Sequence, residues 1–120
     1  MSKKIFILED SPELLDSLEE TLKREGFEVI VHDTGRDALG KIKAAAPDLV
    51  LLGVILPVLD GQAVAAQLSA DDATNNIPIV VISAMMHAKP LFEKFGQVKG
   101  FLAKPVKTPD LLETVKTALA

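Results

Sequence analysis

Two carboxylates, one hydroxyl and one ammonium group follow short apolar runs and could together do metal or phosphate chemistry. Glu9 and Asp10 come directly after the first such run, and Ser83 and Lys104 follow two later ones. Neighbouring carboxylates repel each other unless a cation lies between them, and Mg²⁺ accepts such oxygen ligands. A hydroxyl and a lysine opposite that cation would suit phosphate oxygens. These residue types indicate a site for a cation and a phosphoryl group.

Each of these residues also has an interpretation without chemistry. Glu9 and Asp10 would interact favourably with the dipole at the start of a following helix. Ser83 could be a small residue at a strand end, and Lys104, before Pro105, a solvated surface lysine. The functional interpretation therefore depends on whether the fold brings the four side chains to one place.

Short apolar runs alternate with amphipathic segments along the chain. The runs are rich in Val, Ile and Leu, which is typical of strands buried on both faces. The amphipathic segments carry helix signals, such as Ser or Thr before Pro at the start and Gly or Pro at the end. The predicted strands are 5–8, 27–31, 49–52, 79–82 and 100–103, and the predicted helices lie between Ser11 and Gly26, over 34–46, 61–70 and 91–95, and after the capping residue Thr108.

This alternation predicts one α/β domain over residues 1–120. Buried strands separated by helices form a doubly wound parallel sheet with helices on both faces, here with five strands in the order 2-1-3-4-5. In such a sheet, ligands bind beyond the carboxyl ends of the strands, where the strand order reverses. The residues that follow the predicted strands are therefore expected to share one crevice.

Composition excludes several functional classes. The 120 residues carry a net charge of −4 and contain no cysteine. The negative charge disfavours nucleic acid and anionic membranes as partners, and the lack of cysteine excludes disulfides and thiolate chemistry. The sequence shows no signal peptide and no apolar run long enough to span a bilayer. We expect a cytoplasmic protein that binds neither nucleic acid nor membrane, with its oligomeric state left open.

Several short motifs accompany the acidic pair Glu9-Asp10. They are PDLVLL at 47–52, LPVLDG at 56–61, IPIVVISA at 77–84 and GFLAKP at 100–105. Together with the acidic pair, they make the whole chain resemble the receiver domain of bacterial response regulators, the phosphoacceptor module of two-component signalling. The resemblance implies a flavodoxin-like fold, no enzymatic activity, and a protein partner such as a histidine kinase or an effector domain.

The resemblance also implies a role for each crevice residue. Glu9 and Asp10 would bind Mg²⁺ together with a phosphoacceptor aspartate. Ser83 and Lys104 would contact the acyl phosphate, and Phe101 would move with Ser83 as a switch. The bond between Lys104 and the following proline would be cis.

Gly53 stands where the family has its phosphoacceptor aspartate, and the distances to Pro57 and Asp60 leave a single register. Glycine has no carboxylate, so an aspartyl phosphate cannot form at this position, and the third metal carboxylate is lost. We therefore expect no cofactor beyond weakly bound Mg²⁺. Without its usual anionic partner, Lys104 is expected to turn toward Asp10. Asp60 is expected to begin the next helix and not to replace the nucleophile.

The segment 85–95 is a second departure from the family. Pro90 predicts a loop followed by a short helix, where the family has a longer one. The two methionines of this segment are either core residues or part of an adaptable surface for a partner. Leu91 and Phe92 are further candidate apolar anchors on that surface, which would lie beside the last strand and the last helix.

These departures lead to a functional hypothesis and two alternatives. The hypothesis is an atypical receiver, a pseudo-receiver that signals by protein–protein contact without phosphorylation. One alternative is an ordinary phospho-accepting receiver in which Gly53 replaces the aspartate by engineering. The other is a small Mg²⁺-dependent enzyme, which would need a glycine-rich phosphate loop or an activated nucleophile near the first strand. The sequence contains neither feature there.

Overall fold

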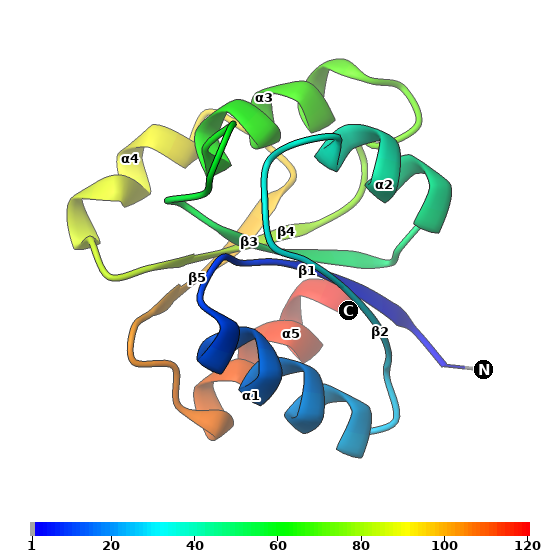
Figure 1. Cartoon of the computed structure of the whole chain (residues 1–120), viewed down its shortest axis with the longest axis vertical. Helices are drawn as coiled ribbons and strands as arrows, with labels where there is room; N and C mark the ends of the chain where they lie inside the picture. The colour runs from blue at the N-terminus through cyan, green and yellow to red at the C-terminus, as the bar shows by residue number, and fades with distance from the viewer. Residues whose placement is uncertain (1) are drawn as a thin grey trace.

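A parallel sheet forms the centre of the computed structural model, which describes residues 2–120 apart from the side chain of Met86. Its strand order confirms the predicted 2-1-3-4-5 topology. The order places β5 and β2 at the two edges and β3 in the middle (Figure 1). The strands are β1 (Lys4–Leu8), β2 (Glu28–His32), β3 (Leu49–Gly53), β4 (Ile79–Ser83) and β5 (Val98–Ala103).

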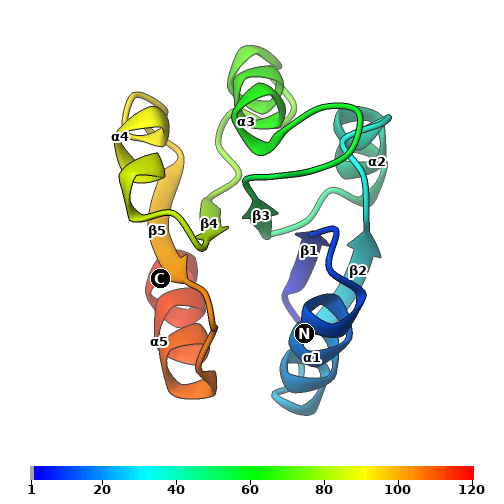
Figure 2. The ribbon, with the colours of Figure 1, turned by 60° about the vertical axis from the view of Figure 1, so that its left-hand side comes forward.

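Helices cover both faces of this sheet (Figures 1 and 2). One face carries α1 (Pro12–Arg24) and α5 (Thr108–Leu119), and the other carries α2 (Ala38–Ala45), α3 (Gly61–Ala70) and α4 (Lys89–Phe92). A short 3-10 turn, η1 (Met86–Ala88), precedes α4. Within residues 2–120, no helix has the length and apolar character needed to cross a membrane.

Alternate residues of the central strands supply two separate apolar cores. In β1, Phe6 and Leu8 pack toward α2, α3 and α4, whereas Ile5 and Ile7 pack toward α1 and α5. All four side chains are at most 1% exposed. Burial on both faces explains why the strands read as continuous apolar runs in the sequence.

The register of the sheet brings the strand ends to one edge. Leu8 of β1 pairs with Leu52 of β3, and Gly53 pairs with Ile82 of β4. At the other side of β4, Ser83 pairs with Ala103 of β5. The residues that directly follow β1 and β5 therefore lie at the same edge as the last residues of β3 and β4.

The predicted starts of α1 and α3 are confirmed by their caps. The Ser11 hydroxyl accepts a hydrogen bond from the backbone N–H of Leu14 at 3.4 Å. Asp60 Oδ1 accepts one from the backbone N–H of Ala63 at 2.9 Å. Each bond satisfies one N–H that the helix itself leaves without a partner. Asp60 thus has the helix-starting role expected for it.

The second helix begins at Ala38 and not at residue 34, because tertiary contacts hold the preceding turn. Thr34 Oγ1 and the N–H of Gly35 both donate to the carbonyl of Pro57, at 3.0 and 2.9 Å. A Cβ at Gly35 would overlap the Leu59 carbonyl oxygen. These contacts join the loop before α2 to the loop after β3, and the local sequence pattern contained no sign of them.

Smaller differences occur in the C-terminal half. Helix α5 includes Thr108, and its N-cap is Lys107, whose side chain makes no capping bond. Helix α4 begins at Lys89, one residue before Pro90, because proline is tolerated in the first turn of a helix. Strand β5 begins at Val98, two residues before the predicted start.

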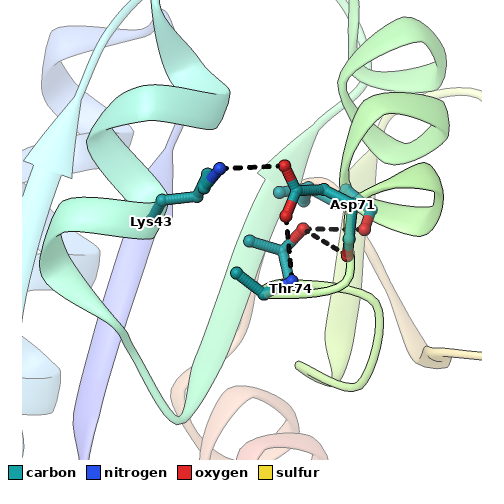
Figure 3. A network of polar contacts seen from close by, with 5 residues as sticks. Lys43, Asp71 and Thr74 are labelled. Carbon is teal, nitrogen blue, oxygen red and sulfur yellow. Dashed lines mark hydrogen bonds and ion pairs between the residues drawn. The ribbon is translucent and has the colours of Figure 1, made fainter.

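A polar network holds the loop between α3 and β4 (Figure 3). Asp71 accepts from the N–H of Ala73 at 2.9 Å and pairs with the Lys43 ammonium at 3.0 Å. The bond from Ala73 and then the pairing with Lys43 hold the pKa of the Asp71 carboxyl below its usual value. The buried hydroxyl of Thr74 donates to the Leu68 carbonyl at 2.7 Å. This network joins α2 and the end of α3 to the loop that follows α3.

We expect Thr74→Val to lower the free energy of unfolding by about 1–3 kcal/mol, because valine keeps the shape and leaves the Leu68 carbonyl without this donor. Urea denaturation measures the loss. The control is Thr117→Val, at an exposed threonine of α5, which should change the free energy of unfolding by less than about 0.5 kcal/mol. Equal losses in the two variants would contradict a structural role for the Thr74 hydroxyl.

Candidate functional site

The carboxyl edge of the sheet brings together three of the predicted site residues. Glu9 follows β1, Gly53 ends β3 and Lys104 follows β5, and Glu9 contacts both of the others. Ser83 ends β4 at the same edge but forms its hydrogen bonds elsewhere. Asp10 is exposed to solvent. The crevice is therefore centred on one acidic residue of the predicted pair.

The Glu9 carboxylate is buried and has one satisfied and one unsatisfied oxygen. Its Oε2 accepts from the backbone N–H of Ser11 at 3.0 Å and from Lys104 Nζ at 3.2 Å. Its Oε1 is buried without a hydrogen-bond partner among the described residues. The Glu9 side chain is only 1% exposed, so its charge depends on a counter-charge within the protein.

Gly53 supplies the space that this carboxylate occupies. A Cβ at Gly53 would lie 2.7 Å from Glu9 Oε1 and 3.2 Å from the Leu8 carbonyl oxygen. The first distance is shorter than real Cβ contacts, so any side chain at position 53 would force Glu9 to move. The Glu9 carboxylate thus lies at the place where a side chain on residue 53 would begin.

Lys104 pairs with Glu9, which corrects the expectation that it would turn toward Asp10. Its ammonium reaches from the end of β5 to the end of β1, although β3 and β4 lie between these strands. The physical reason is burial: Glu9 needs a counter-charge, whereas water already solvates Asp10. The bond between Lys104 and Pro105 is cis, as predicted.

The predicted metal ligands do not fit a divalent ion in this arrangement. Among residues 2–120, no three His, Cys, Asp or Glu side chains are grouped so that they could hold a metal. Glu9 is buried and already neutralised by Lys104, and Asp10 lies in solvent. A divalent ion normally requires several oxygen ligands around one point, and the third carboxylate is missing at Gly53.

The Ser83 hydroxyl is engaged with the segment after β4. It accepts from the N–H of Met85 at 2.9 Å and donates to the Met85 carbonyl at 3.2 Å. These bonds shape the turn that leads into η1, so the hydroxyl positions this segment. The predicted phosphate contact of Ser83 stays a prediction.

Phe101 lines a pocket of about 200 Å³ between α4 and β5. Its ring is half-buried, and Lys89 Nζ lies 5.4 Å from the ring centroid, within the range of a cation–π contact. The sequence places Lys89 among the charged residues of the segment 85–95, but an exposed lysine beside a proline carries no local signal of a contact with Phe101. The pocket is lined by Val81, Ser83, Met85, Ala88, Lys89, Phe101, Leu102 and Ala103.

The apolar anchors expected in the segment 85–95 divide into core and surface. Phe92 is completely buried, so its prediction as a surface anchor is wrong. Leu91 is 46% exposed, and Met85 is half-buried beside the pocket. The side chain of Met86 lies outside the described residues. A helix of a single turn directs only one side toward the sheet, which explains why the adjacent Leu91 and Phe92 differ.

Known proteins with similar sequences confirm the resemblance. The family model for the response regulator receiver domain matches residues 5–116. Protein PilH of Pseudomonas aeruginosa is 29% identical over 118 residues, covering 98% of each chain. The polar-differentiation response regulator DivK of Brucella anthropi is 28% identical over 120 residues, covering 99% of this chain and 98% of DivK.

A solved structure supports the same assignment. The chemotaxis response regulator CheY4 of Vibrio cholerae superposes with a TM-score of 0.92 at 26% identity, over 99% of this chain and 100% of CheY4. Its similarity spans the whole sheet and the helices on both faces. From the family match, the relatives and the strand order together, the chain belongs to the response regulator receiver domain family of two-component signalling.

Proposed function

We propose that this receiver domain signals through contact with a protein partner and without phosphorylation at the usual position. The observation that carries the proposal is Gly53 at the end of β3, with the Glu9 carboxylate in the adjoining space. Phosphoryl transfer to a receiver needs a nucleophile, and glycine has none. Glu9 does not replace it, because the side chain is 1% exposed and paired with Lys104.

A receiver of this kind is expected to keep one conformation. A ligand or modification shifts a two-state equilibrium only when it interacts differently with the two states. Lys104, which the family uses to contact the phosphoryl group, is already paired with Glu9. The Ser83 hydroxyl is bonded to the backbone of Met85. Neither group is poised for a phosphate, which supports a constitutive surface as the site of recognition.

The surface around α4 and β5 is our candidate for that recognition. It combines the pocket beside Phe101 with the exposed Leu91 and the ammonium of Lys89. Apolar surface rimmed by charged groups is typical of sites that bind protein. A histidine kinase or an effector domain with an apolar side chain and an acidic neighbour would match it. We place this binding in the cytoplasm, with no role for nucleic acid or membrane and no catalysis.

We expect the wild-type domain to stay unmodified when it is incubated with acetyl phosphate and Mg²⁺, because position 53 offers no carboxylate. Intact-protein mass spectrometry measures the gain of one phosphoryl group. A stable adduct that maps to an acidic residue of the crevice would contradict the proposal.

Gly53→Asp is the matched variant for this experiment and tests the engineering alternative. The introduced aspartate must displace the Glu9 carboxylate before it can accept a phosphoryl group, since its Cβ would lie 2.7 Å from Glu9 Oε1. Rapid phosphorylation of the variant would favour an ordinary receiver whose aspartate was replaced. An inert variant would show that the site has lost more than the nucleophile.

Leu91→Glu should abolish recovery of the protein partner in co-purification from the source cells, followed by quantitative mass spectrometry. A carboxylate at the exposed position 91 would place a charge on the apolar surface without entering the core. One control, Val31→Glu, introduces the same charge on the edge strand β2, where the side chain is 38% exposed. The other, Asp10→Asn, removes the exposed charge that follows Glu9 of the crevice. Partner loss with Asp10→Asn and retention with Leu91→Glu would place recognition at the crevice instead. Circular dichroism confirms that each variant folds.

A further inference from the structure

We infer that the Lys104 ammonium is the resident cation of the crevice, in place of a divalent metal ion, so that this domain does not take up Mg²⁺ there. The inference concerns the charge balance of Glu9, Gly53 and Lys104 and holds whichever partner the domain binds. Three observations support it: the Glu9–Lys104 pair, the missing side chain at position 53, and the unsatisfied Oε1 of Glu9.

The first observation is the charge balance. Glu9 brings one negative charge to the buried crevice, and Lys104 brings one positive charge at 3.2 Å. The pair is neutral, so a divalent ion at the same place would leave an excess of positive charge next to an ammonium. Because Glu9 is buried and the Lys104 side chain is only 32% exposed, water screens only part of that repulsion. A carboxylate at position 53 would have offset it, and Gly53 removes that carboxylate.

The second observation is the missing side chain at position 53, beside which Lys104 reaches Glu9. Its ammonium contacts a residue after β1 from a position after β5, across the ends of β3 and β4. In this arrangement the Glu9 carboxylate lies beside Gly53, where a Cβ would be 2.7 Å from Oε1. The position of the Glu9 carboxylate therefore depends both on the space at Gly53 and on the ammonium of Lys104. An aspartate at position 53 would compete with Glu9 both for this space and for Lys104.

The third observation is the unsatisfied oxygen of Glu9, which could bind a cation if Lys104 were absent. Glu9 Oε1 is buried without a hydrogen-bond partner among the described residues, so it keeps unused capacity to bind a cation. If the ammonium were removed, the buried carboxylate would lack any counter-charge, which is a costly state. Glu9, with Asp10 as the adjacent residue, would then favour an external cation. The crevice thus contains a latent cation site that Lys104 keeps closed.

The test is a Mg²⁺ titration of the wild-type domain and four variants at constant ionic strength. Binding is measured by the NMR shifts of the amides near Ser11 and by the temperature of thermal unfolding. Lys104→Gln removes the resident charge, and Gly53→Asp adds a carboxylate. Lys104→Arg keeps the charge, and Lys107→Gln removes a charge from an exposed neighbour.

The wild type, Lys104→Arg and Lys107→Gln should show no saturable shift and no Mg²⁺-dependent rise in unfolding temperature. Lys104→Gln and Gly53→Asp should bind Mg²⁺ at least about tenfold more tightly than the wild type, because each leaves the crevice with excess negative charge. Both should also gain thermal stability as Mg²⁺ is added.

Saturable binding by the wild type, with an affinity equal to that of Lys104→Gln, would overturn the inference. If Lys104→Gln folds only with Mg²⁺, the inference is supported in its strongest form. If Lys104→Gln fails to fold in either buffer, saturable Mg²⁺ binding by the wild type overturns the inference, and its absence in the wild type beside binding by Gly53→Asp supports it. This test is separate from the test of the proposed function. Mg²⁺ binding is measured by titration, whereas phosphorylation is measured by mass spectrometry after incubation with acetyl phosphate, so either result can fail without the other.

Discussion

The crevice depends on the need of one buried carboxylate for a counter-charge. Glu9 is held below the surface after β1, where an unpaired charge would be costly. The Lys104 side chain is 32% exposed, so water offsets part of the cost of separating the pair, but the Glu9 carboxylate would remain buried without a counter-charge. The pairing therefore constrains three strands at once: β1 carries the acid, β3 must leave room for it, and β5 must deliver the ammonium.

In a phospho-accepting receiver, the charge of the site changes when a phosphoryl group is added. In this domain the charges of Glu9 and Lys104 already balance each other. In the receiver family, the lysine and the hydroxyl are available to a phosphoryl group. Here Lys104 is bound to Glu9, and the Ser83 hydroxyl holds the turn at Met85. The same polar residue types are present, but their contacts are internal. Lys104 and Ser83 thus have structural roles in a domain that has no nucleophile at position 53.

The α4 side of β5 carries the features suited to binding. Phe101 and Lys89 line a pocket, and Leu91 lies exposed nearby. The short α4 leaves this region less covered than a long helix would. A partner can recognise a surface of this kind without any covalent change to the domain. The balanced crevice and the open α4–β5 surface therefore both support the proposal of protein binding without phosphorylation.

Much of the fold could be predicted from the sequence, because burial on both faces of a sheet imposes a pattern on each strand. Local patterns predicted the strands and the caps at Ser11 and Asp60, and the general rules for parallel sheets then predicted the strand order and the helices on both faces. The start of α2 did not, since it is set by bonds to the distant Pro57. The burial of Phe92 beside the exposed Leu91 likewise depends on how α4 meets the sheet.

The same division applies to the site. The sequence by itself determined which residues follow the strands, and it showed that position 53 has no nucleophile. Only the tertiary structure decided that Lys104 pairs with Glu9 and not with Asp10. The reason is that two adjacent acids are alike in sequence, whereas burial separates them: one carboxylate enters the space beside Gly53 and needs an ammonium, and the other remains in water.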